Sequence, residues 1–436
     1  MNSPVEPYYV KAEHLYWVHG RHGEDPFAGA SSQDYRYPPV AHAPRIQQLS
    51  DGLEKLGLHP FHLPIGVDLT QDEHGNPTSA SRCIRCDRVD GFPCLLGAKA
   101  DAEWAVVRPA LAAHPDLTLM TRATVQQLLT DPSGRVVTGV VTTMADGSTS
   151  TFAADIVVLS AGSILSSVLL LKSANDTHPA GLGNSSDVVG RHYMRHNNLA
   201  LMAFSKDPNP TVFQKTLSLN DFYGPSKHWD YPMGNIQMLG KSDDWQVKGQ
   251  APKALGWGPD LGYGLVAKHS LDFWLASEDL PLPDSRVTLR ADGSVKLAVQ
   301  PDNNSDGLKR LRHVFDSMLN DLGLQSKSFE RSLYLAQGNG RLGHRPPSRH
   351  HPIRHRPAHL SPGRPLQHAR PRQPLRHRRQ LHALHRRRQP HPHHHRQRPT
   401  RRRTHHRSPH RLTAETAESV TGSLRRRLPV FVCCAA

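Results

Sequence analysis

Apolar residues recur with helical spacing in three segments of the chain, at residues 45–56, 98–113 and 308–322. A repeat of three to four residues places apolar side chains on one face of a helix, where they can pack against a core. We therefore predict a helix in each segment. The expected apolar faces of the last two are Trp104, Ala105, Val107, Leu111 and Ala112, and Leu311, Val314, Phe315, Met318 and Leu319.

Between the second and third helices, the pattern changes to short apolar runs separated by turn residues. Strands are predicted at residues 117–120, 123–129 and 136–143, and Asp146-Gly147 is a typical hairpin turn. This spacing predicts a small group of strands rather than further helices.

The run at residues 154–162 is a short apolar strand that ends in Ala161-Gly162 and leads into a predicted helix at residues 163–171. In parallel α/β sheets, such a transition presents backbone N–H groups to a phosphate. Plain sheet packing produces the same pattern, so a nucleotide-binding edge and an ordinary buried strand both remain open.

Residues 197–299 alternate apolar and polar positions between Gly, Pro and Asp turns, with example strands at residues 285–289 and 294–298. This pattern predicts a second, mainly antiparallel β domain. The predicted fold class is therefore α/β, with an incomplete Rossmann-like domain followed by an antiparallel domain.

Charge divides the chain near residue 343. The whole chain carries +16, but residues 344–436 contribute +21 and residues 1–343 contribute −5. A basic chain would indicate nucleic acid or an acidic membrane surface as partner, whereas the acidic body indicates an ordinary soluble protein. No apolar run of about eighteen residues and no signal-peptide pattern occur, so we expect no membrane span and a cytoplasmic location.

The basic tail has an unusual composition. Between His344 and Arg411 it contains 20 Arg and 16 His, with no Lys, Asp, Glu or aromatic residue. Codons for Arg, His and Pro are what a GC-rich gene yields out of register, and a one-base shift permits N-L-Y-V-I-D-A-S-F at residues 373–381. The same shift permits I-G-A-V-N-P-T-L-T-I-I-A-N-A-L at residues 385–399. We therefore expect a frameshift near Gly343 and a disordered, low-complexity tail at residues 344–436.

The tail and the cysteines also allow other predictions. Arg clusters would give salt-dependent nucleic-acid binding, and the histidines at residues 391–395 would chelate metal. Cys83, Cys86 and Cys94 have part of the spacing of a zinc site, which Asp87 or His74 would complete. Reduced buried thiols are the alternative.

Several segments, in the right order, resemble the glucose–methanol–choline (GMC) family of FAD-dependent oxidoreductases. The resemblance covers nearly all of residues 1–343, and the strings permitted by the shifted frame are similar to the family's C-terminal motif. The matching segments are EPYYVKAEHLYWVHG, PRIQQLSDGL, CIRCDRVDGFPCLLGAKADA, ADIVVLSAGSILSSVLLLKSA, VGRHYMRHNN and SEDLPLPDSRVTL.

The resemblance implies FAD as cofactor and places three residues beside it. Val125 matches the position where the family's backbone meets the adenine, and Ala161 and Gly162 match the strand end next to the cofactor. An ordinary buried strand residue is the alternative for each. The implied domains are a lid and cofactor-proximal segment at 1–95, the rest of the FAD-binding domain at 96–195, and a substrate-binding domain at 196–343.

The chain also departs from the family pattern. No strand, G-x-G-x-x-G turn and helix open it, so the N-terminal flavin-binding unit is expected to be missing. The literal match at residues 338–343 precedes Pro-rich sequence and is interpreted as coincidence. Leu335 stands where relatives often carry a His, and the N-P motif of the catalytic pair occurs only in the shifted frame. We therefore assign no catalytic residue and no metal site, and interpret His196-Asn197-Asn198 as a packing junction.

The expected function is oxidation of a CH–OH group of an alcohol or sugar by an FAD-dependent dehydrogenase or oxidase. The sequence identifies neither the substrate nor the electron acceptor. As printed, the chain is expected to bind FAD poorly or not at all and to have no turnover. The competing prediction is a nucleic-acid- or metal-binding protein that works through its basic tail.

Overall fold

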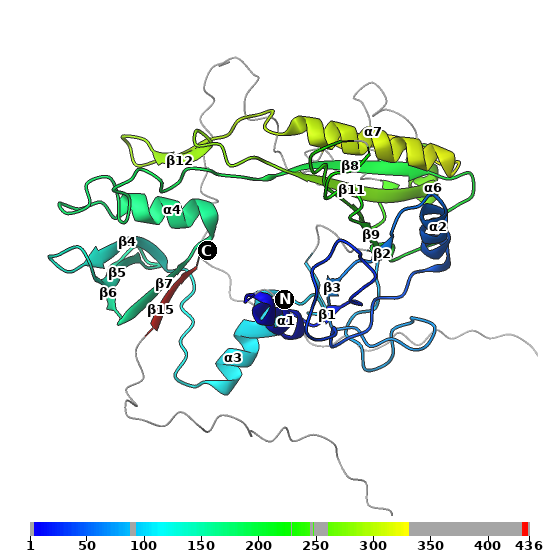
Figure 1. Cartoon of the computed structure of the whole chain (residues 1–436). Helices are drawn as coiled ribbons and strands as arrows, with labels where there is room; N and C mark the ends of the chain where they lie inside the picture. The colour runs from blue at the N-terminus through cyan, green and yellow to red at the C-terminus, as the bar shows by residue number, and fades with distance from the viewer. Residues whose placement is uncertain are drawn as a thin grey trace, which may run out of the picture. The chain divides into compact units, whose positions relative to one another are not determined.

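The computed structural model describes residues 4–87, 93–227, 229–244, 247, 260–330 and 430–434, all of which belong to one compact unit (Figure 1). Among these residues, no helix combines the length and apolar character needed to cross a membrane. The predicted tail, apart from residues 430–434, lies outside the described residues, as do Leu335 and the glycine pattern at 338–343.

A six-stranded antiparallel sheet is the largest element, in the order β14-β8-β11-β10-β9-β2. Its two longest strands pair over nine residues each, from His196 opposite Glu278 to Phe204 opposite Ser270. The sheet confirms the predicted antiparallel β part of the fold. Its strands are β2 (Phe61–His62), β8 (His196–Phe204), β9 (Leu217–Leu219), β10 (Asn235–Met238), β11 (Ser270–Glu278) and β14 (Gln325–Glu330).

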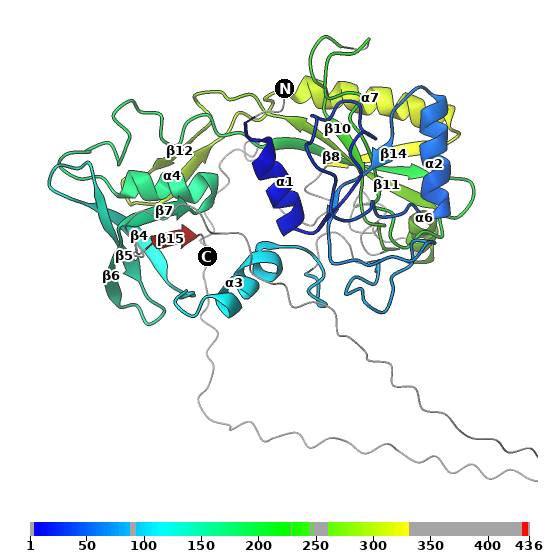
Figure 2. The same ribbon diagram turned by 60° about the horizontal axis from the view of Figure 1, so that its bottom comes forward.

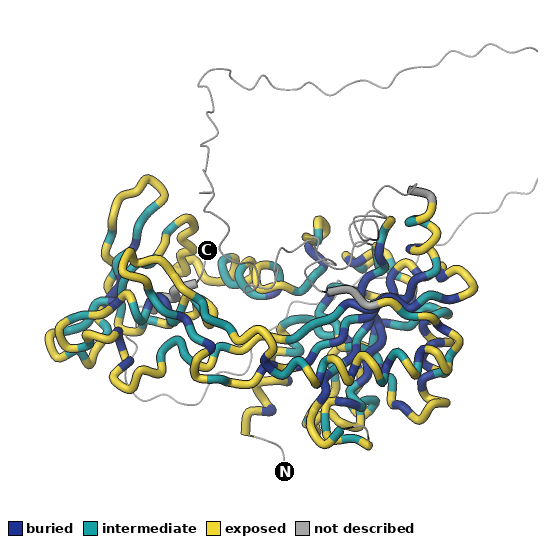
Figure 3. The backbone as a smooth tube through the Cα atoms, turned by 90° about the horizontal axis from the view of Figure 1, so that it is seen from above, coloured by how far each residue is buried: buried dark blue, intermediate teal, exposed yellow. Residues whose placement is uncertain are grey.

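Two of the predicted helices pack against this sheet and form the main core with it. Figure 3 shows that buried residues are concentrated in one part of the backbone. They are α2 (Pro44–Lys55) and α7 (Ser305–Asp321). Phe315 of α7 meets Phe273 of β11 edge-on, with ring centroids 5.0 Å apart, and both rings are fully buried. The core joins N-terminal and C-terminal segments, because α2 and β2 come from residues before 63 and pack with strands beyond residue 195.

A smaller part of the structure contains an antiparallel meander and a strand–helix unit. The meander has the order β4-β5-β6, and α4 packs against it around Leu128, Val140 and Leu169. Residues 117–120 were predicted as a strand but form none, since these apolar residues are exposed and have no neighbouring strand. The elements are β4 (Thr124–Thr130), β5 (Val137–Thr143), β6 (Thr149–Ala153), β7 (Ile156–Ser160) and α4 (Gly162–Lys172).

The last described strand, β15 (Val430–Cys434), pairs in parallel with β7, from Val430 opposite Ile156 to Cys434 opposite Ser160 (Figure 2). We had expected the whole of residues 344–436 to be disordered. Unlike the rest of the tail, this short run is apolar and rich in Val, which favours strand structure. It adds a second parallel strand at the predicted strand–helix unit.

The predicted helix at residues 98–113 forms in part. A π-helical turn (Glu103–Val107) precedes α3 (Arg108–Ala113), and Ala105 is the buried member of the expected apolar face. The remaining elements lie outside the two sheets described above. They are α1 (Glu6–Leu15), β1 (Val18–His19) paired with β3 (Ile65–Gly66), α6 (Asp260–His269), and the predicted hairpin of β12 (Arg286–Leu289) and β13 (Val295–Ala298).

Candidate functional site

The predicted cofactor edge lies at the junction between β7 and α4. Gly162 has φ +79°, and a Cβ built on it would meet no atom within 4 Å. Both Gly162 and the following Ser163 are exposed. The start of α4 is therefore accessible, and its first residue adopts a backbone conformation that side chains rarely tolerate.

Ala161 is less available than the sequence suggested. Its backbone N–H donates to Ser166 Oγ at 3.1 Å, within the first turn of α4. The N–H of Ala161 is thus already satisfied inside the helix start. Any anion at this edge would meet the N–H groups that follow Ala161.

Val125 lies on β4, the edge strand of the meander. Its side chain packs against the cluster around Leu128 and Leu169, so only its backbone could face a ligand. The ladder to β5 passes directly from Val125 to Gln127, which leaves Gln126 as a β-bulge. Bulges re-aim backbone groups and often border functional sites. The structure thus brings β4 and α4 together in one apolar cluster.

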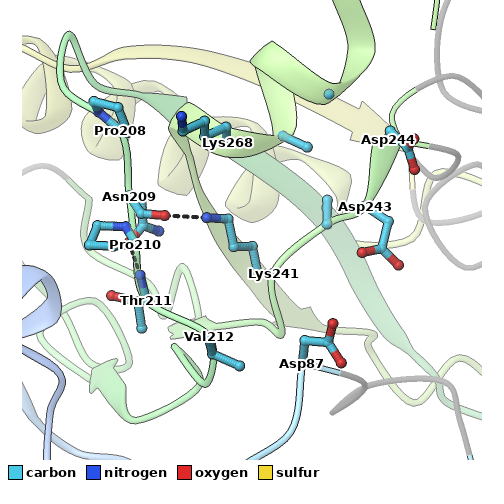
Figure 4. A pocket seen from close by; sticks show the side chains of 13 residues that line it. Asp87, Pro208, Asn209, Pro210, Thr211, Val212, Lys241, Asp243, Asp244 and Lys268 are labelled. Atoms are coloured by element: carbon cyan, nitrogen blue, oxygen red, sulfur yellow. Dashed lines mark hydrogen bonds between the residues drawn. The ribbon is translucent and has the colours of Figure 1, made fainter. Parts of the chain in front are cut away.

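A separate cavity of about 530 Å³ opens at the end of the six-stranded sheet (Figure 4). Such a volume suits a small molecule. Three connections meet there: the loop after β8, the loop after β10 and the last turns of α6. Together with Asp87 they supply the lining, which consists of Pro208, Asn209, Pro210, Thr211, Val212, Lys241, Ser242, Asp243, Asp244, Gly264, Ala267 and Lys268.

Asn209 fixes the loop after β8. Its side-chain amide donates to the Ser270 carbonyl at 2.8 Å and to Gln214 Oε1 at 3.0 Å, while its Oδ1 accepts the Thr211 N–H at 3.1 Å. Its carbonyl also accepts a hydrogen bond from Lys241 Nζ. Because Asn209 is almost completely buried, these bonds hold one wall of the cavity rigidly.

The carboxylate of Asp272 on β11 is fully buried and is bonded to Ser242 of the cavity lining. It accepts hydrogen bonds from Gln214 Nε2 at 2.9 Å, from the Ser242 N–H at 3.0 Å, and from the hydroxyls of Ser242 and Ser270 at 3.1 Å. Burial raises the pKa of Asp272, and these four bonds oppose that rise. Asp272 thereby ties the central strand to two loops of the cavity.

Charges of both signs line the cavity and lie on opposite sides of it. Figure 4 shows the amino groups of Lys241 and Lys268 toward Pro208, and the three aspartates on the other side. Burial lowers the pKa of Lys241, the nearby charge of Asp272 raises it, and that of Lys268 lowers it again. Lys241 is therefore an ammonium group held in a partly desolvated place beside a second cation.

The cysteine cluster shows no metal geometry. Among the described residues, no three His, Cys, Asp or Glu side chains come together as a metal site, and Cys83, Cys86 and Cys94 are free thiols. Cys83 is buried, and burial raises its pKa.

A pair of histidines links the N-terminal segment to the sheet. His42 stacks on His62 with ring centroids 4.0 Å apart, and His42 Nδ1 lies 2.8 Å from Thr216 Oγ1. His62 Nδ1 lies 2.9 Å from Glu24 Oε2. Burial, together with the charges of His62 and Arg85, lowers the pKa of His42 to about 3. His42 is thus neutral in the folded protein.

This shift predicts acid sensitivity. Because the unfolded chain binds a proton at His42 below its ordinary pKa of 6.5 and the folded chain does not, stability falls as the pH drops from 6.5 toward 3. The loss is at most about 1.4 kcal/mol per pH unit. We expect His42→Gln to lose less stability than the wild type over this range, measured by urea unfolding at several pH values. His74→Gln, at an exposed histidine, should follow the wild type, and equal slopes for all three proteins would refute the assignment.

The segment His196-Asn197-Asn198 begins β8 and makes connecting hydrogen bonds. The amide of Asn197 donates to the Asn303 carbonyl at 2.8 Å, and Asn198 Oδ1 accepts the Trp274 indole N–H at 2.9 Å. These bonds join neighbouring elements and leave no evident catalytic pair there.

The cavity was missed by the sequence analysis. Its charged residues are spread between Asp87 and Lys268, and none forms a motif. The one available signal was the set of polar residues at strand ends, such as Asn209 after β8 and Ser242 after β10. Without the order of the strands in the sheet, these polar residues do not show which strand ends lie side by side.

Known proteins resemble this chain over part of its length. The sequence profile described as GMC oxidoreductase matches residues 40–198. Similar proteins include 6'''-hydroxyparomomycin C oxidase of Streptomyces lividus, 32% identical over 43% of this chain and 33% of the relative. The fructose dehydrogenase large subunit of Gluconobacter japonicus is 26% identical over 66% of this chain and 52% of the relative. The 2-methyl-1,2-propanediol dehydrogenase of Mycolicibacterium austroafricanum is 25% identical over 77% and 59%, respectively.

The chain spans between about a third and six tenths of the length of these relatives. The profile covers four of the six segments that carried the resemblance in the sequence, including the β7–α4 junction with Ala161 and Gly162. The segments at residues 6–20 and 277–289 lie outside it. Residues 40–198 therefore resemble the GMC oxidoreductases.

Proposed function

We propose that this protein contributes to FAD-dependent oxidation of a CH–OH group in an alcohol or sugar. The observation that carries the proposal is the exposed β7–α4 junction with its open glycine, in the part of the chain that matches the family. Relatives named as a 6'''-hydroxyparomomycin C oxidase, a fructose dehydrogenase and a 2-methyl-1,2-propanediol dehydrogenase support hydroxyl-bearing substrates.

The residues at the junction fit the cofactor. Gly162 leaves room where a side chain would otherwise stand, and the backbone of Val125 is offered at a bulge on an edge strand. These residues and Ala161 would hold FAD, which when bound supplies the hydride acceptor. The chain's own contribution is a helix start that favours the negative charge of a pyrophosphate.

The cavity beside β8, β10 and β11 is the proposed place for the substrate. Asn209 and Asp272 hold its walls in a fixed arrangement, which would orient a bound hydroxyl compound. Lys241, Asp243 and Asp87 offer donors and acceptors within one cavity. We also propose that the printed chain lacks turnover, because the catalytic N-P motif occurs only in the shifted frame.

The cofactor proposal is tested by replacing Gly162. We expect weak, saturable quenching of flavin fluorescence by the wild-type chain, and at least tenfold weaker binding by Gly162→Asp, whose carboxylate would repel the pyrophosphate. Gly147→Asp is the matched control, because Gly147 also has a positive φ of +84° and open space, but lies in the β5–β6 turn. The Gly147→Asp variant keeps the same basic tail, so nonspecific binding of flavin to the tail is the same in all three proteins. The site is wrong if both variants bind FAD alike, or if the wild type shows no saturable binding.

A further inference from the structure

We propose that Cys94 is a thiol that reacts with hydrogen peroxide, and that Cys83 then resolves the product, so that the two cysteines form a reversible disulfide. This modification site goes beyond the proposed function and does not depend on flavin binding. The two thiols belong to one small apolar cluster, but they differ in exposure and in the groups around the sulfur.

The thiol of Cys83 is buried. The Arg85 N–H donates to Cys83 Sγ at 3.4 Å. Burial raises the pKa of Cys83, this hydrogen bond lowers it only in part, and the nearby thiols of Cys86 and Cys94 raise it further. Cys83 is therefore a protonated thiol that an oxidant in solution does not reach. Its neighbours in the apolar cluster are Val40, Val67, Leu69, Ala98 and Phe213.

The thiol of Cys94 has different surroundings. It packs against the same cluster but is only partly buried, and Leu95 beside it is 96% exposed. The Ala98 N–H donates to Cys94 Sγ at 3.3 Å. Burial raises the pKa of Cys94, but the N–H groups of Ala98, Lys99 and Leu96 and the charge of Lys99 lower it below its ordinary value. The thiolate is the nucleophilic form of cysteine, so Cys94 combines access with the reactive charge state.

The turn around Cys94 is held in place by packing. The Gly97 N–H donates to the Cys94 carbonyl at 3.1 Å, and Gly97 has φ +63°. The indole of Trp104 lies against Gly97, where a Cβ would be only 2.5 Å from the ring. The Arg108 guanidinium stacks on this indole, 4.1 Å from the ring centroid. The N–H groups near Cys94 Sγ are therefore preorganised to stabilise negative charge on the sulfur.

A short path of hydrogen bonds connects the two cysteines. The Cys83 N–H donates to the Asp68 carbonyl at 2.9 Å, and the Asp68 N–H donates to the Ala98 carbonyl at 2.8 Å. Ala98 is also the residue whose N–H reaches Cys94 Sγ. Both cysteines thus flank the same piece of backbone, which places a buried thiol next to an accessible one.

The proposed reaction has two steps. The Cys94 thiolate attacks one oxygen of hydrogen peroxide, so that an S–O bond forms, the O–O bond breaks and hydroxide leaves. The sulfur is oxidised to a sulfenic acid, and the peroxide is reduced. The Cys83 sulfur then attacks the Cys94 sulfur, the S–O bond breaks, and water leaves with the proton of Cys83. An external dithiol restores both thiols by exchange.

The test treats the reduced full chain with equimolar hydrogen peroxide, blocks the remaining thiols with N-ethylmaleimide and maps tryptic peptides by mass spectrometry. Trypsin cleaves between these cysteines, so Cys83, Cys86 and Cys94 fall in three separate peptides, apart from Cys433 and Cys434. We expect a disulfide between the Cys83 and Cys94 peptides that dithiothreitol reverses. Before oxidation, N-ethylmaleimide should modify Cys94 several-fold faster than Cys86, which is also partly buried.

Variants separate the roles of the two cysteines. Cys83→Ala removes the resolving thiol, so dimedone should label a sulfenic acid at Cys94 in this variant. Lys99→Gln should slow oxidation of Cys94 by roughly twofold, because it removes a nearby positive charge. Lys55→Gln, at an exposed lysine of α2, is the matched control and should leave the rate unchanged.

Three results would overturn the proposal. They are a disulfide that does not contain both Cys83 and Cys94, dimedone labelling of Cys86 in place of Cys94, and alkylation of Cys94 no faster than that of Cys86. Because the peptide map uses the wild-type chain, it decides the assignment even if Cys83→Ala fails to fold.

Discussion

Replacing Asp272 with Ala is expected to lower the free energy of unfolding by about 3 kcal/mol. The change removes the acceptor for the Gln214 amide, the Ser242 N–H and two hydroxyl groups, all in a place without access to water. Buried donors without partners cost far more than the net value of the bonds they made. The measurement is the midpoint of urea unfolding.

Asp306→Ala provides the comparison for this substitution. Asp306 lies in the exposed first turn of α7 and pairs with Lys309 at 3.0 Å on the surface. Its loss should change stability by less than about 0.5 kcal/mol. Asp272→Asn keeps the shape of the side chain but places an amide group among hydrogen-bond donors. Its loss of stability should therefore lie between those of Asp272→Ala and Asp306→Ala. A midpoint for Asp272→Ala equal to that of Asp306→Ala would show that the network contributes little.

Gly234→Ala is expected to destabilise the sheet by more than about 3 kcal/mol, since strain and a steric clash add. Gly234 immediately precedes β10 with φ +132°, and a Cβ there would lie 2.0 Å from the Ala276 carbonyl oxygen. Ala276 cannot move away easily, because its strand is paired with β8 at Asn198 and with β10 at Asn235. The expected readout is a large drop in thermal midpoint, or loss of soluble protein.

Gly293→Ala separates strain from the clash. Gly293 also has a positive φ, +76°, but a Cβ there would meet nothing within 4 Å in the turn between β12 and β13. It should cost only about 1 kcal/mol, the price of a left-handed alanine. If both glycine variants lost the same stability, close approach at Ala276 would not be the cause.

The β7–α4 unit shows how far the sequence could go at the cofactor edge. An apolar run ending in Ala161-Gly162 predicted the strand and the helix, and both formed within one or two residues of the expected bounds. What the sequence did not show was that Ser166 occupies the Ala161 N–H, or that Val125 borders a bulge. Both features depend on the local backbone conformation, which residue type alone does not specify.

The cavity shows the opposite limit. Asp87, Asn209, Lys241 and Lys268 meet there, although up to 181 residues separate them in sequence. No motif joins them, because their proximity depends on the order of strands in the sheet. The order of the strands depends on how the whole sheet packs, and many strand orders are compatible with the same alternation of apolar and polar residues.

The sequence by itself determined the amphipathic faces of α2 and α7, the antiparallel strands within residues 197–299 though not helix α6 between them, and the resemblance to GMC oxidoreductases, because these depend on local periodicity and on short motifs. Only the tertiary structure decided that β2 from the N-terminal segment closes one edge of the main sheet, and that β15 pairs with β7. It alone placed the lysines on one side of the cavity and the aspartates on the other. The reason is that pairing and burial between distant segments are set by the free energy of the whole core, to which each local pattern contributes only a part.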